Sequence, residues 1–153
     1  MKIFLTILGL TLTLVACSGS KNSTENQPLN ITEEEQAIFN SGKQDTVRIA
    51  NEDVEYEIII LEPGFNTWLN TVATPRKYFE QSWLESRNRV LVANWNLRAQ
   101  QTNRKDPELY IFPIDYDQRI NYGYEVNYLL YNYFVFFQRK YNQRLGPFYP
   151  RIN

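Results

Sequence analysis

Apolar and polar residues alternate along two neighbouring stretches in the first half of the chain. Residues 46–50 and 54–62 carry branched or aromatic side chains at every second position, and residues 51–53 are polar or acidic. This alternation predicts two strands that pair as an antiparallel hairpin. Two strands alone are only marginally stable in water, so we expect the hairpin to pack on helices or to gain a third strand. Residues 109–114 are a further strand candidate, restricted to a sheet edge because Pro113 has no N–H to donate.

Four other stretches have the three-to-four-residue apolar spacing of helices. They are residues 33–40, 65–72, 76–101 and 123–143. Thr32 and Glu35 form a capping-box pattern at the start of the first stretch, and Pro75 separates the second from the third. The sequence therefore predicts two short helices and two long ones.

The last helical stretch is the most apolar part of the chain after residue 30. Residues 128–137 are aromatic or aliphatic except for Asn132. A helix that is apolar on nearly all sides is either a central core helix or a membrane span, and a span needs about 20 apolar residues. The sequence therefore predicts a core helix. The expected fold class is α+β and predominantly helical, with a small antiparallel hairpin packed on a long helix and an aromatic-rich C-terminal core helix.

The first residues have the layout of a secretory signal peptide. Lys2 supplies a positive charge, residues 3–14 are mostly apolar, and small residues follow. The apolar run is shorter than the roughly 20 residues of a spanning helix, which disfavours a permanent transmembrane anchor. Cys17 is the only cysteine in the chain, so it has no intramolecular disulfide partner.

Leu14-Val15-Ala16-Cys17 resembles the lipobox of bacterial lipoproteins. The resemblance implies cleavage between Ala16 and Cys17, a diacylglyceryl group on the cysteine sulfur, and a further fatty chain such as palmitate on the new amine. The alternative is an ordinary signal peptide that is cut beside a cysteine. Lipidation is favoured because it accounts for a single thiol in an exported protein.

The expected organisation is a signal peptide (1–16), a lipidated cysteine with a flexible tether (17–30), and one globular domain (31–153). The tether is polar, and a flexible chain of its length has a root-mean-square span of about 20 Å. Two or more acyl chains hold a protein stably on a bilayer. The residue after the cysteine is Ser18, and a residue of this kind at that position resembles the pattern of lipoproteins that are sent to the outer membrane. We therefore expect a cell-envelope protein on the outer membrane, facing the periplasm.

Composition narrows the possible chemistry. The formal net charge is −1 and the chain contains no histidine. A net charge close to zero argues against a nucleic-acid partner. Histidine is the commonest general base and the commonest transition-metal ligand in proteins, so its absence disfavours both kinds of site. No nucleotide-binding loop or nucleophile elbow is present. We expect no cofactor and no metal, and a non-enzymatic interaction or structural module is favoured over an enzyme.

Several strings in the mature region are similar to an uncharacterised family of small envelope lipoproteins. The strings are residues 65–69, Leu84-Glu85 with Asn88, 94–96 with Arg98, Tyr122-Gly123 with Glu125, Asn127-Tyr128, and 130–134. The resemblance covers roughly residues 65–141. It implies no activity, cofactor or site, so no catalytic residue is assigned.

Polar residues within the two long helices are the candidate site. They are Asn94, Trp95, Asn96, Arg98, Glu125, Asn127 and Asn132. One interpretation is an internal hydrogen-bond network that joins the helices, since buried polar groups must be paired. The other is a cleft in which Trp95 and Tyr128 stack on a sugar or peptide.

Two functional hypotheses follow from these features. The first is a module held on the bilayer through acylated Cys17 that docks on an envelope protein or the cell wall. The alternative is a glycan-binding or peptide-binding protein, or a small glycan hydrolase. The hydrolase would need two facing carboxylates, for example Glu85 and Glu125, about 5–9 Å apart.

Overall fold

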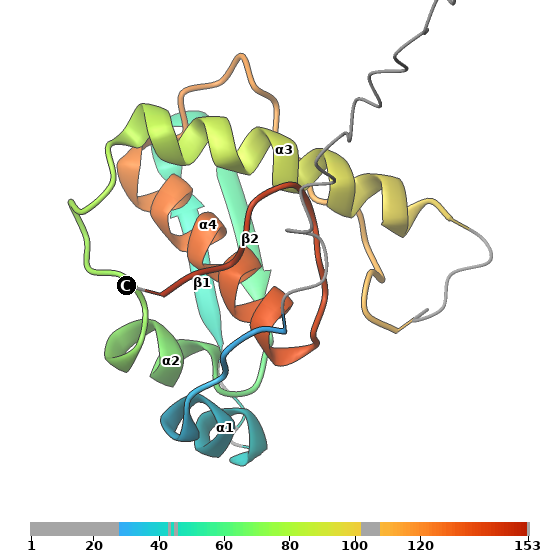
Figure 1. Ribbon diagram of the computed structural model, residues 1–153. Coiled ribbons are helices and arrows are strands. Elements are labelled where there is room, and N and C mark those ends of the chain that lie inside the picture. The colour runs from blue at the N-terminus through green and yellow to red at the C-terminus, as the bar shows by residue number, and fades with distance from the viewer. Residues whose placement is uncertain (1–27, 43, 45, 102–107, 153) are drawn as a thin grey trace, which may run out of the picture.

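The computed structural model describes residues 28–42, 44, 46–101 and 108–152. The predicted signal peptide, Cys17 and most of the predicted tether lie outside these residues. The elements are α1 (Glu33–Asn40), β1 (Val47–Asn51), a 3₁₀ turn (Glu52–Val54), β2 (Tyr56–Ile60), α2 (Phe65–Thr71), α3 (Gln81–Ala99) and α4 (Gly123–Lys140). Figure 1 shows α4 lying along the hairpin, with α1 and α2 near its C-terminal end, and α3 packs on α4 from Asn127 to Phe137. The α+β, predominantly helical fold class is confirmed.

The hairpin forms where the alternation predicts it. β1 and β2 pair antiparallel, from Val47 opposite Ile60 to Asn51 opposite Tyr56. Ile49 and Ile60 are buried against the helices, and β1 packs directly on α4. The hairpin is therefore stabilised by packing on a helix, and among the described residues the sheet has these two strands.

α4 is the central helix of the domain. Two-thirds of its residues are buried, including the Asn132 that interrupts its apolar run. One side contributes Phe136 to a core shared with the hairpin, α1 and α2. Another side contributes Phe134 and Phe137 to a core shared with α3. The prediction of a core helix is confirmed, and within the described ranges no helix is both long and apolar enough to cross a bilayer.

The predicted start of the long helix at residue 76 is wrong. α3 begins at Gln81, five residues later. Lys77 has a φ of 68°, in the left-handed region, so the backbone there cannot continue a right-handed helix. Residues 76–80 instead form the connection between α2 and α3, and the Lys77 N–H donates to the Tyr124 hydroxyl at 2.5 Å.

The expected edge strand at residues 109–114 does not form. Side chains of α3 hold this segment in place of a strand partner. Trp95 Nε1 donates to the Phe112 carbonyl at 2.9 Å, and the Asn96 amide both donates to and accepts from the backbone of Ile114, at 2.8 and 2.7 Å. Three backbone groups that a ladder could pair, the Phe112 carbonyl and the N–H and carbonyl of Ile114, are thus satisfied by α3.

Candidate functional site

The predicted polar residues do not form one network. Asn94 and Asn132 each donate to a carbonyl one turn back in their own helix, on Val90 and Tyr128, at 2.8 Å. Asn127 joins the two long helices through a side-chain hydrogen bond, and Trp95 of α3 packs on Phe134 and Phe137 of α4. The carboxamide oxygen of Asn127 lies 3.1 Å from Nδ2 of the buried Asn88 on α3.

Arg98 and Glu125 lie at separate places on the domain. Arg98 donates to the Tyr110 hydroxyl at 2.6 Å and to the Arg144 carbonyl, and so ties α3 to the C-terminal segment. Glu125 accepts a bidentate pair from Arg76 at 2.6–3.1 Å, with both side chains about half exposed. Arg98 and Glu125 therefore do not pair with each other, and each is bonded to a different part of the domain.

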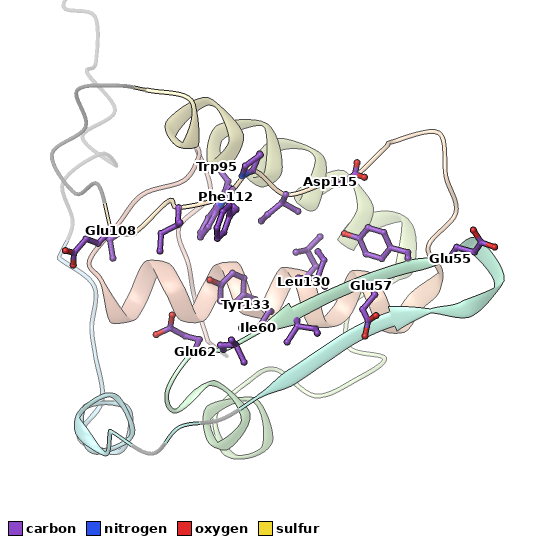
Figure 2. Close-up of a pocket in the computed structure, with 18 residues that line it drawn as sticks. Glu55, Glu57, Ile60, Glu62, Trp95, Glu108, Phe112, Asp115, Leu130 and Tyr133 are labelled. Atoms are coloured by element: carbon purple, nitrogen blue, oxygen red, sulfur yellow. The ribbon is translucent and has the colours of Figure 1, made fainter.

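Trp95 and Asn96 flank an open groove. The groove has a volume of about 660 Å³ and lies between β2 and residues 108–115, which we call the wall segment. Figure 2 shows β2 on one side, the wall segment on the other, and Leu130 and Tyr133 of α4 between them. Trp95 lines the groove, whereas Asn96 holds the wall segment through Ile114. The volume falls within the range of ligand sites, about 300–1,000 Å³.

Large apolar side chains reach solvent along both sides of the groove. Ile59 and Leu61 are 58% and 64% exposed on one side, and Ile111 and Phe112 are 60% and 75% exposed on the other. These four make up more than half of the large apolar side chains that are exposed in the described part of the chain. Exposed apolar side chains gathered around one groove are a feature of interaction sites in soluble domains.

Carboxylates surround the apolar lining. Among the described residues that line the groove, five are acidic and none is basic: Glu55, Glu57, Glu62, Glu108 and Asp115. Glu57 pairs with Arg48, and Glu62 accepts from Lys140 at 2.7 Å. Figure 2 places Glu62 and Glu108 near one end and Glu55 and Asp115 near the other. The groove is therefore apolar in the middle and negatively charged at its ends.

One polar atom in the lining lacks a partner. The Tyr56 hydroxyl is buried and has no hydrogen-bond partner among the described residues. Burial raises the pKa of this phenol, and the nearby Tyr122 and Asp115 add to the effect, so the group stays protonated at neutral pH.

Part of this groove could have been found in the sequence. Residues 58–61 are four consecutive apolar residues, Ile-Ile-Ile-Leu, so both faces of the strand are apolar at this point. A half-buried strand alternates, and the break in alternation indicates a second apolar face. The position of the wall segment opposite that face has no comparable sequence signal, because it depends on contacts with α3.

A buried ion pair was also missed. Arg139 of α4 donates from Nε and Nη2 to the two carboxylate oxygens of Glu35, both at 2.5 Å. Their side chains are 2% and 0% exposed, and Trp68 Nε1 adds a bond of 3.1 Å to the carboxylate. Burial by itself raises the pKa of Glu35. The bonds from Arg139, the Thr32 N–H and Trp68 more than offset this, and the pKa lies below its usual value. Because the capping box already gave Glu35 a local role, the sequence did not indicate its pairing with Arg139.

The described residues do not place Glu85 and Glu125, the carboxylates considered for a hydrolase, in the groove. They contain no group of three or more histidine, cysteine or acidic residues that could hold a metal ion. Glu85 accepts from Gln81 at 2.8 Å, Glu125 is engaged by Arg76, and neither lines the groove.

Comparison with known proteins identifies a family. No curated protein and no solved structure matches the chain. The model of DUF6146, described as a family of unknown function, matches residues 3–148, which is nearly the whole sequence. The chain therefore belongs to the DUF6146 family.

Proposed function

We propose that this protein is a lipid-anchored envelope lipoprotein whose folded domain binds a protein partner in the groove between β2 and the wall segment. The observation that carries the binding role is the solvent-facing apolar lining between two fixed sides. Exposed apolar surface is unfavourable in water unless a partner covers it. A rigid groove also loses little conformational freedom when it is occupied.

The anchoring part of the proposal comes from the start of the chain. Leu14 to Cys17 resembles a lipobox, and the match to the family begins at residue 3, so Cys17 lies inside the matched region. The tether would then hold the groove within about 45 Å of the bilayer when fully stretched. Confinement of this kind favours a partner in the same membrane or in the adjacent envelope layer.

Mass spectrometry of the protein isolated from its own cells tests the anchor. The expected product begins at Cys17 and carries two or three acyl chains. A Cys17→Ser variant should carry no acyl chain and should keep residues 1–16, unlike the wild-type protein, because both the thioether and the processing that depends on it are lost. An unmodified Cys17, or a chain that keeps residues 1–16, would disprove the anchoring proposal.

Photocrosslinking in intact cells tests the binding role. A photoreactive amino acid at position 112, beside the groove, should yield one discrete adduct whose partner is then identified. The matched control is position 97, where Leu97 is also exposed but does not line the groove. Equal labelling from both positions, or none from either, would contradict a binding role for the groove.

A further inference from the structure

We propose that the groove takes an extended peptide segment of a protein partner, which adds to β2 as a third strand. The segment has apolar side chains in its middle and lysine or arginine at both ends. This inference rests on the proposed function, since it names the kind of partner that the groove would accept. Three features of the groove lead to it.

The first feature is the free edge of β2. Among the described residues β1 is the one strand partner of β2, and the opposite edge faces the groove in Figure 2. A strand edge presents a row of N–H and C=O groups that can pair with a further strand. The wall segment does not use them, because Trp95 and Asn96 hold its backbone. Strand addition to such an edge is a common mode of peptide recognition.

The second feature is the arrangement of apolar side chains along that edge. Tyr56, Ile58 and Ile60 point toward the helices, so Ile59 and Leu61 stand on the outer face. An added strand with apolar residues at alternate positions would form cross-strand pairs with Ile59 and Leu61. Its other face would lie against the floor of the groove, which Leu130 and Tyr133 line. A glycan could contact these side chains but could not form a regular ladder with β2.

The third feature is charge. Among the described residues, two of the five carboxylates have positive partners, Arg48 and Lys140, which leaves Glu55, Glu108 and Asp115 as sites for an incoming cation. They lie toward the two ends of the groove (Figure 2). From residue 55 to residue 62, an extended partner would run for about seven residues, or roughly 23 Å. Basic residues at both ends of such a segment would therefore meet carboxylates.

The same charges argue against two other occupants. A second copy of the chain paired edge to edge would place like carboxylates close together, which disfavours the contact. Residues 18–27 of the tether are polar and contain no apolar alternation, so they do not match the lining. A separate protein with a basic and apolar extended segment satisfies both constraints.

Synthetic peptides test the mode of binding on the full chain in detergent. The probe is a fluorescein-labelled peptide of alternating valine and threonine with lysine at both ends, and binding is followed by fluorescence anisotropy. One control peptide carries N-methyl groups on two consecutive interior nitrogens, whose N–H groups point to opposite strand edges. Another control has glutamate in place of lysine. We expect each control to bind at least tenfold more weakly than the probe.

Protein variants assign the effect to the groove. Phe112→Ala and the double change Glu108→Gln with Asp115→Asn should each weaken binding several-fold. Leu97→Ala and Glu34→Gln are matched controls outside the groove and should leave binding unchanged. Thermal unfolding of each variant confirms that the domain is folded. Equal binding of the N-methylated peptide, or no binding of the probe, would overturn strand addition.

The two proposals can fail separately. If position 112 crosslinks a defined partner while the probe does not bind, the groove is an interaction site and strand addition is wrong. If the crosslink is also absent, the proposed function fails with it. If a purified second copy of the chain gives the crosslink, self-association replaces the extended segment as the occupant and overturns the inference.

Discussion

Replacing Glu35 by Gln removes the negative charge from a fully buried ion pair while keeping the size of the side chain. In the wild-type domain this carboxylate accepts both bonds from Arg139 and a third from Trp68. Arg139 also donates to the carbonyls of Asn30 and Pro150, at 2.7 and 2.9 Å. The pair thus joins α1, α2 and α4 to the first and last described segments of the chain.

The expected loss is large because the guanidinium stays buried without its counter-charge. Removing one partner of a buried pair costs about 3–5 kcal/mol. That is a substantial part of the roughly 5–15 kcal/mol that stabilises a typical domain. For a domain of this size it corresponds to a decrease in melting temperature of about 10–20 °C.

Urea unfolding of the full chain, followed by tryptophan fluorescence, measures the effect. Arg48→Gln is the matched control, because Arg48 and Glu57 form an ion pair whose side chains are 57% and 46% exposed. An exposed pair contributes little to stability, because water and salt screen it. The double change Glu35→Leu with Arg139→Met should lose less stability than the two single changes added together, since no unpaired charge remains.

Unfolding of Glu35→Gln at the same urea concentration as Arg48→Gln would refute a role for the buried charge. That role would also be refuted if the double change were as harmful as the sum of its parts. Either result would mean that the buried guanidinium finds other compensation, from water or from the carbonyls around it.

Three further predictions concern stability. Because the pKa of Glu35 is lowered in the folded state, the stabilisation from its carboxylate is fully present above about pH 4.3 and is lost as the pH falls through the pKa of the folded state. The urea midpoint of Glu35→Gln should therefore fall less between neutral and acidic pH than that of the wild type. Asn96→Ala removes two hydrogen bonds to the wall segment and should lower the stability of the domain by about 1–2 kcal/mol. Limited proteolysis should then cut the wall segment faster than in the wild type. An unchanged rate of cleavage would contradict the role given to Asn96. Gly64→Ala would place a Cβ 2.9 Å from the backbone oxygen of Ile38 at a φ of 86°, whereas the Cβ of Gly42→Ala would meet open space at a φ of 60°. The left-handed backbone costs about 1–2 kcal/mol in both variants. Calorimetry should therefore show a larger loss of stability for Gly64→Ala than for Gly42→Ala.

The sequence determined the elements that depend on local chemistry. The capping box of α1 forms as predicted, with Thr32 and Glu35 bonded to each other's backbone N–H. The hairpin and the core helix also follow directly from the spacing of apolar residues. In each case the information lies within a few residues, because a cap, an alternation or a buried stripe is set by neighbours along the chain.

The groove, in contrast, depends on contacts between segments that are distant in the sequence. Residues 109–114 have the composition of an edge strand, yet two side chains of α3 bind their backbone and keep them off the sheet. That displacement leaves the edge of β2 open and exposes apolar side chains on both sides. Trp95 and Asn96 were in the predicted site, but their role in shaping a groove depends on a segment more than ten residues away.

Long-range pairing of charges was equally beyond the sequence. Glu35 and Arg139 are separated by 104 positions, and each has a satisfactory local explanation, one in a capping box and the other near a helix C-terminus. Nothing in composition or spacing selects one carboxylate among many for a given guanidinium. Burial makes the choice, since a charge removed from water must meet its opposite in the folded core. Local pattern therefore specified the helices and strands, and their packing specified the groove and the ion pair.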